Sequence, residues 1–217
     1  VFFISDWAGG GRPVPAPAAP GAARRLARRP LVTLFVALLG IGFAIGTLNV
    51  WAVATAETYR TDILSGLLPA AFSTGSFLGG LVYGRRTWPG STTRQLLTSS
   101  AAFLAGWLPL LTLPGPYAAT AAVVAPGAFL TVVVACAYVT TDALTPTGRT
   151  SEAYAWLILS IGVGQAAGTA LAGRLADHAF AIAALPATGA TFALTVLLLA
   201  RPGQAPAHHG RNRREHA

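Results

Sequence analysis

The sequence predicts an all-α membrane protein with six transmembrane helices, and three observations support this fold class. Of the 217 residues, 53% are hydrophobic and only 10% are charged, well below the roughly 25% charged residues of an average soluble domain. Several stretches without any charged residue or histidine exceed the roughly 18 residues that indicate a membrane span. The two-residue alternation of a β-barrel is absent, so helices, which satisfy their own backbone groups, are expected.

The spans are expected to follow one another with short connections. The uncharged run from 95 to 141 is too long for one helix. It divides at Pro114-Gly115-Pro116, because two prolines around a glycine favour a tight turn. The six expected spans are 31–54, 63–84, 95–113, 117–141, 153–173 and 179–200. Within them, helix bends are expected at Pro69, Pro109, Pro126 and Pro186.

The positive charges predict the orientation. The chain has no lysine, and all but two of its 15 arginines precede the first span, follow the last, or lie in alternate connections. The exceptions are Arg60 and Arg174. The positive-inside rule therefore predicts a multi-pass protein of the cell membrane with both ends of this segment in the cytoplasm. Cytoplasmic arginines account for the net charge of +8, so no nucleic-acid partner is expected.

Composition divides the chain into four segments. Residues 1–6 begin with four apolar residues and no initial methionine, so we expect them to end a preceding helix. Residues 7–30, rich in proline, alanine and arginine, are expected to form a cytoplasmic linker. Residues 31–200 hold the six-helix bundle, and residues 201–217 form a basic cytoplasmic tail. Its three histidines have no cysteine pair or carboxylate cluster beside them, so neither a metal nor a cofactor is expected.

A basic linker followed by six spans, with a basic connection between the second and third, resembles the C-terminal half of a major facilitator superfamily transporter. That connection carries Gly-x-x-x-Asp-Arg-x-Gly-Arg-Arg in the family. Here Gly80, Arg85 and Arg86 keep the glycine and the arginine pair, while Gly84 stands where the acid would be.

A second similarity lies at residues 150–177. The cytoplasmic start of this segment, with Glu152, Ala153 and Trp156 before a glycine-studded helix, is similar to the penultimate helix of bacterial drug- and sugar-efflux members of the superfamily.

The resemblance implies a half bundle of two three-helix repeats that works with an N-terminal six-helix half of the same protein. It implies export of a drug-like or sugar-like small molecule across the lipid bilayer. Glu57, Asp62, Asp142, Glu152 and Asp177 all lie at span ends, whereas proton relays are usually intramembrane carboxylates. If protons drive transport, the coupling residue is therefore expected in the other half.

Polar residues inside the spans are the candidate substrate-binding residues, because amides and hydroxyls at this depth face the bundle interior or a cavity. The candidates are Asn49, Trp51, Ser73, Ser76, Tyr138, Gln165 and Thr169. Hydrogen bonding between helices is the alternative role for each of them. This uncharged set suits a neutral or amphipathic substrate. Glycines spaced four apart predict close helix packing, and they are Gly42, Gly46, Gly164 and Gly168.

Two other functions are weighed against transport. A six-span scaffold, or a homodimeric carrier without a partner half, fits the same composition. An intramembrane serine protease would need Ser76 and His178 as a dyad, but Ser76 is expected near mid-membrane and His178 in the connection before the last span. The chain is therefore not expected to be an enzyme. The single cysteine, Cys136, falls inside the fourth span and is expected to pack.

Overall fold

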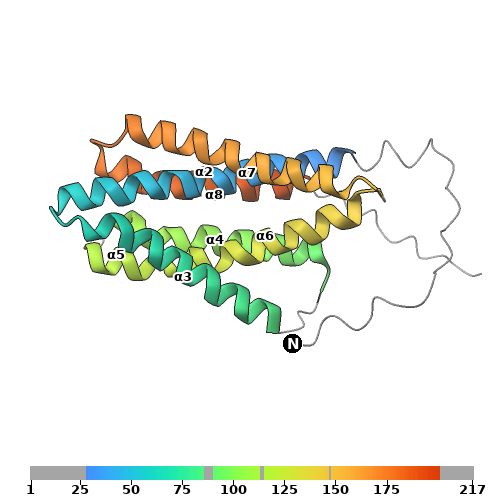
Figure 1. Ribbon diagram of the computed structural model, residues 1–217, viewed down its shortest axis with the longest axis horizontal. Coiled ribbons are helices and arrows are strands. Elements are labelled where there is room, and N and C mark those ends of the chain that lie inside the picture. Colours follow the sequence, from blue (N-terminus) through green and yellow to red (C-terminus); the bar gives the residue numbers. More distant parts are fainter. Residues whose placement is uncertain (1–27, 86–89, 113–114, 147, 201–217) are drawn as a thin grey trace, which may run out of the picture.

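The computed structural model describes residues 28–85, 90–112, 115–146 and 148–200 (Figure 1). The expectations for 1–6, for most of 7–30, for Arg86 and for 201–217 lie outside these residues. The helices are α2 (Arg28–Thr58), α3 (Ile63–Arg85), α4 (Thr92–Trp107), the 3₁₀ helix η1 (Leu108–Thr112), α5 (Pro116–Ala122), α6 (Val124–Leu144), α7 (Thr150–Arg174) and α8 (Ala179–Leu199).

The all-α membrane fold class is confirmed for the described part of the chain. When η1 is joined to α4 and α5 to α6, six helical segments are long and apolar enough to cross a membrane. The described ranges contain no strand. The spans begin and end within a few residues of the sequence expectation. The largest difference is α2, which runs from Arg28 to Thr58, because the first and last turns of a helix can leave the hydrocarbon layer without unfolding.

Two spans change their winding next to a proline. The amide of Leu108 donates to the carbonyl of Ala105, three residues back, so α4 tightens into η1 just before Pro109. The fourth span is divided at Val123 into α5 and α6. Pro126 has no amide hydrogen to offer the preceding turn, which weakens the helix there.

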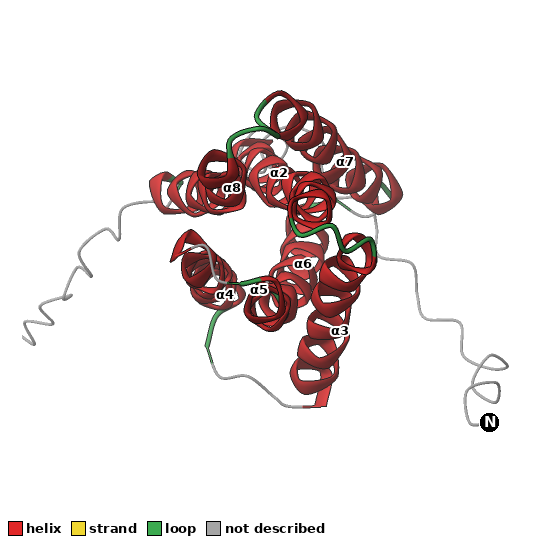
Figure 2. Cartoon of the chain, turned by 90° about the vertical axis from the view of Figure 1, so that its left-hand side faces the viewer, coloured by secondary structure: helices red, strands yellow, loops and turns green. Residues whose placement is uncertain are grey.

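The helices form two layers (Figure 1). In one layer, α2 packs on α7 and α8; in the other, α6 packs on α3 and α4. The end-on view in Figure 2 places α2 and α6 centrally, with α3 and α7 on one side and α4 and α8 on the other. We call these the α3/α7 side and the α4/α8 side.

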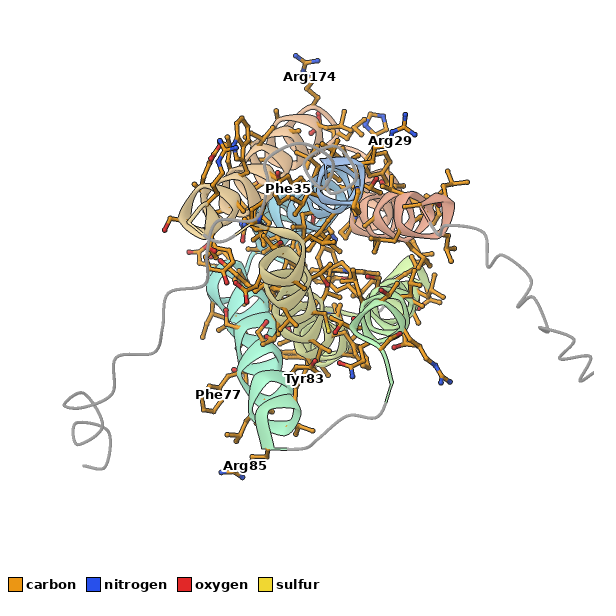
Figure 3. The ribbon with its side chains drawn as sticks, turned by 90° about the vertical axis from the view of Figure 1, so that its right-hand side faces the viewer. Arg29, Phe35, Phe77, Tyr83, Arg85 and Arg174 are labelled. Carbon is orange, nitrogen blue, oxygen red and sulfur yellow. The ribbon has the colours of Figure 1, made fainter. Side chains whose placement is uncertain are left out.

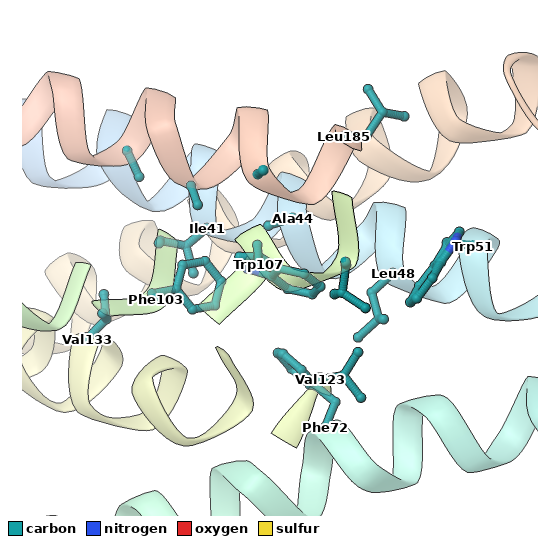
Figure 4. Packing of buried hydrophobic residues seen from close by; sticks show 14 of the residues in the cluster. Ile41, Ala44, Leu48, Trp51, Phe72, Phe103, Trp107, Val123, Val133 and Leu185 are labelled. Atoms are coloured by element: carbon teal, nitrogen blue, oxygen red, sulfur yellow. The ribbon is translucent and has the colours of Figure 1, made fainter. Parts of the chain in front are cut away.

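Aromatic rings fill the space where the layers meet (Figure 4). The indole ring of Trp107 stacks on Phe72 at 5.9 Å between centroids and meets Phe103 edge-on at 5.8 Å. Leu48 and Ile41 of α2 belong to the same buried cluster. The core therefore joins α2, α3 and α4, helices that are drawn from both layers.

The alternating helix directions collect most of the described arginines at one end. Arg29 and Arg94 lie in the first turns of α2 and α4, Arg85 ends α3, and Arg149 precedes α7. We call this the arginine-rich end. In the end-on view of Figure 3, Arg85 points away from the bundle. Arg174, the last residue of α7, lies at the opposite end.

Candidate functional site

Four glycines bring α2 and α7 into backbone contact. Each lies where an added β-carbon would overlap a carbonyl oxygen of the opposite helix. The pairs are Gly42 with Ile161, Gly46 with Gln165, Gly164 with Leu39 and Gly168 with Phe43. These are the four glycines that the sequence analysis assigned to helix packing.

The contact between α3 and α6 is built in the same way. Its close pairs are Gly75 with Val124, Gly79 with Ala128 and Gly127 with Phe72. A fourth pair is a hydrogen bond, in which the Thr131 hydroxyl donates to the Ser76 carbonyl at 2.7 Å. The Ser76 hydroxyl donates in return to the Gly127 carbonyl at 3.0 Å. Ser76, a candidate substrate-binding residue, thus bonds to a neighbouring helix.

The two contacts share one register. On the central helices, Leu39, Gly42 and Phe43 of α2 correspond to Val124, Gly127 and Ala128 of α6, each 85 residues later. On the outer helices, Phe72, Gly75 and Gly79 of α3 correspond to Ile161, Gly164 and Gly168 of α7, each 89 residues later. The pair Gly46 with Gln165 then corresponds to Thr131 with Ser76. The constant offset at every pair means that the α2–α7 contact and the α6–α3 contact have the same register.

The sequence carries a trace of this correspondence that pattern analysis of the spans missed. The pattern Gly-x-x-x-Gly-x-x-x-x-Gly-Arg occurs at residues 75–85 and again at 164–174, and it ends both α3 and α7. Arg85 and Arg174 therefore occupy equivalent positions. Because α3 and α7 run in opposite directions, the two arginines lie at opposite ends of the bundle.

Five of the seven candidate substrate-binding residues differ in their exposure and partners. Asn49 and Ser73 are exposed. Trp51 is only 7% exposed and belongs to the buried core cluster. Thr169 is exposed, yet its hydroxyl lies 3.3 Å from the Gly46 carbonyl, to which it donates. Gln165 is half-buried, at the contact with α2.

Tyr138 lies at the junction of α6 and α7. Its ring and that of Tyr154 have centroids 5.1 Å apart and planes inclined at 72°. The Tyr154 hydroxyl donates to Oδ1 of Asp142 at 3.5 Å. Tyr138, a candidate substrate-binding residue, thus lies in one cluster with Tyr154 and Asp142, which were not among the candidates.

The end of α3 and the connection after it, which carry Gly80, Arg85 and Arg86, lie only partly within the described residues. Gly80 faces the Thr131 methyl group, 3.0 Å from where a β-carbon would stand. Arg85 is exposed at the last position of α3, and Arg86 lies outside the described residues.

Three side chains from α3, α4 and α6 form a polar cluster that sequence reasoning did not find. The Tyr83 hydroxyl donates to Oε1 of Gln95 at 2.8 Å and lies 3.4 Å from the Cys136 sulfur. The thiol lies 4.0 Å from the same Gln95 oxygen. Cys136 therefore packs as expected, but against polar partners. No spacing along the chain relates residues from three different helices.

The residues weighed for a protease dyad lie at different depths. Ser76 is 13 positions beyond Ile63, which begins α3 at the end of the bundle where α7 gives way to α8. His178 lies at that end and is exposed. At 1.5 Å per residue the two differ in depth by about 20 Å. Within the described ranges, no three or more His, Cys, Asp or Glu residues are grouped so as to hold a metal ion.

The α4/α8 side is apolar. A groove of about 440 Å³ runs between α4 with η1 and α8, and it is lined by Leu104, Leu108, Leu111, Phe180, Ala184, Ala187, Thr188 and Thr191. The hydroxyls of Thr188 and Thr191 donate to carbonyls of their own helix. The groove therefore offers apolar surface whose two hydroxyls bond within their own helix, as lipid contact requires.

Comparison with protein-family models, with curated proteins and with solved structures finds no match for this chain. Its function is therefore inferred from the geometry and chemistry of its own residues.

Proposed function

We propose that this chain is one half of a secondary transporter of the major facilitator type, an exporter of a small molecule that works with a second six-helix bundle. The observation that carries the proposal is the shared register of the α2–α7 and α6–α3 contacts. It relates α2 to α6 and α3 to α7, helices that run in opposite directions, and we infer that α4 and α8 complete two three-helix units. Inverted repeats of this kind are typical of secondary transporters.

Unpartnered polar side chains support a second bundle. The side chains of Asn49, Ser73 and Gln165 have no hydrogen-bond partner among the described residues, and Asn49 and Ser73 are exposed. They belong to α2, α3 and α7, away from the apolar groove between α4 and α8. An unsatisfied amide in lipid costs free energy, so another protein surface, a water-filled path or a substrate should meet these groups.

The glycine contacts suit this function. Backbone contact without intervening side chains gives smooth helix surfaces, on which one part of a transporter can rock against another. We place the protein in the plasma or inner membrane of the cell. By the positive-inside rule, its arginine-rich end then faces the cytoplasm.

Transport by membrane vesicles tests the proposal. Inverted vesicles from cells expressing the protein from its own gene should take up at least one solute from a panel of amphipathic dyes and sugars when energised. Asn49→Val and Gln165→Leu should reduce that uptake at unchanged protein level, because they remove the unpartnered amides. Thr188→Val, in the apolar groove, is the matched control and should transport normally.

Three outcomes would count against the proposal. The vesicles could move none of the solutes, or the amide variants could transport as well as Thr188→Val. Proteoliposomes containing this chain alone could also concentrate a solute, which would favour the homodimeric carrier instead.

A further inference from the structure

Tyr138, Asp142 and Tyr154 form a corner between α6 and α7 at the arginine-rich end. Tyr138 and Asp142 are four residues apart on α6 and so lie on one face, a single turn from each other. Tyr154 of α7 approaches both, with its ring near Tyr138 and its hydroxyl near Asp142. The two helices therefore bring two aromatic rings and one carboxylate together.

The rings are arranged as two walls. Their planes are inclined at 72° with centroids 5.1 Å apart, and both side chains are half-buried. An aromatic ring carries negative charge density on its faces, which attracts a cation placed over it. Ring edges carry positive charge density, so a cation has to lie against ring faces. Two rings inclined at a steep angle can each turn one face toward a ligand in the corner between them.

The carboxylate has no cation beside it among the described residues. Asp142 is exposed and accepts only the hydrogen bond from Tyr154. The guanidinium of Arg149, in the connection that follows, forms an ion pair with Glu152 at 2.8 Å instead. Within the described part of the chain, therefore, no cation compensates the negative charge of Asp142 beside the aromatic rings.

We propose that Tyr138, Asp142 and Tyr154 form a binding site for an organic ammonium ion. The rings would contact its alkyl groups and Asp142 would supply the opposite charge, a combination known from sites that recognise quaternary ammonium. The ammonium head is the ligand class because a bare metal ion needs oxygen or nitrogen ligands that tyrosine rings do not offer. That such an ion is also a substrate rests on the proposed function; its binding does not.

Binding of choline tests this proposal directly. The full chain, purified in detergent, is dialysed to equilibrium against radiolabelled choline. Choline should bind, and 3,3-dimethylbutan-1-ol, which has the same shape with carbon in place of the charged nitrogen, should compete poorly. Tyr154→Leu should weaken binding about tenfold, between the strengths of an exposed and a desolvated cation–π contact. Asp142→Asn should also weaken it, because the ammonium loses its opposite charge. Tyr154→Phe keeps the ring face and should weaken it less.

Matched controls come from the opposite end of the bundle. Glu57→Gln removes an exposed carboxylate and Tyr117→Leu an exposed tyrosine, and both should bind choline normally. Absence of choline binding, equal competition by the neutral alcohol, or unchanged affinity in both Asp142→Asn and Tyr154→Phe would overturn the site. If Tyr154→Leu fails to fold, Asp142→Asn and Tyr154→Phe still decide.

The result is separable from the transport assay. Choline binding in a chain whose vesicles move no solute would keep the ammonium site and remove the transporter. Transport of neutral solutes by a protein that does not bind choline would keep the transporter and remove the ammonium site.

Discussion

Gly164 of α7 lies against the backbone carbonyl of Leu39 in α2, so closely that a β-carbon on Gly164 would overlap the carbonyl oxygen. Lipid tails are as apolar as leucine, so helices in a bilayer associate through close packing rather than through hydrophobic burial. The absence of one methyl group at Gly164 therefore sets how near α2 and α7 can come.

Gly164→Ala should destabilise the protein because the new methyl group forces α2 and α7 apart. The expected loss is about 1–3 kcal/mol, the usual cost of overpacking, and it should lower the midpoint of thermal unfolding in detergent. Gly162→Ala is the matched control on the same helix, since nothing lies within 4 Å of its β-carbon position. Equal midpoints for the two variants would contradict the contact.

The shared register of the two contacts predicts that Gly75 of α3 behaves as Gly164 does. Gly75→Ala should destabilise the protein about as much as Gly164→Ala, because Gly75 lies against Val124 as Gly164 lies against Leu39. Gly66 has open space around it, so Gly66→Ala serves as its control in the same thermal assay. A large effect at Gly164 without one at Gly75 would argue against equivalent contacts.

The reciprocal hydrogen bonds between α3 and α6 should contribute modestly to stability. Thr131→Val and Ser76→Ala should each cost about 0.6 kcal/mol, the average measured for interhelical hydrogen bonds in a membrane protein. Thr74→Val is the control, because the Thr74 hydroxyl donates only within its own helix, to Ala70. Reversible unfolding in mixed micelles measures the differences, and a Thr74→Val loss as large as that of Thr131→Val would refute the assignment.

Among the residues that the structure describes, two buried donors have no hydrogen-bond partner, namely the indole nitrogen of Trp107 and the hydroxyl of Thr141. A buried unsatisfied polar group costs about 1–3 kcal/mol. Thr141→Val, which keeps the shape and removes the hydroxyl, should therefore leave stability unchanged or raise it. Trp107→Phe should be tolerated far better than Trp107→Ala, which also loses the ring contacts with Phe72 and Phe103. Unfolding midpoints that fall for Thr141→Val would reveal a partner for this hydroxyl.

Cys136 should resist thiol reagents in the folded protein. It is fully buried and lies against Tyr83 and Gln95, so a maleimide should label it only after denaturation. Tyr83→Ala opens a space beside the sulfur and should make labelling measurable before unfolding, as followed by mass increase with time. Tyr117→Ala, at an exposed tyrosine, should leave the thiol protected. Rapid labelling of the unmodified protein would contradict the packing.

The two ends of the bundle should face opposite sides of the membrane. In a Cys136→Ala background, Asp177→Cys should react with an impermeant maleimide added to intact cells, whereas Thr93→Cys should react only after permeabilisation. Both positions are exposed, at opposite ends of the bundle. The reverse pattern of labelling would invert the orientation derived from the arginines.

Much of the fold could be predicted from the sequence because hydropathy is a property of short stretches. The six spans and the changes of winding near Pro109 and Pro126 all follow from neighbouring residues. Glycine spacing likewise indicates which face of a helix can approach another helix closely. Even the matching ends of α3 and α7 can be found by comparing the chain with itself.

The sequence by itself therefore determined the number and length of the spans, since lipid leaves the backbone few other ways to satisfy its hydrogen bonds. Only the tertiary structure decided which helices meet. Three contacts depend on surface shapes that fit across helices distant in sequence. They are the contact of Tyr154 with Tyr138 and Asp142, that of Cys136 with Tyr83 and Gln95, and that of Gly46 with Gln165. Such fits have no counterpart in local composition, because packing contacts in a bilayer are chosen by shape and hydrogen bonding rather than by apolarity.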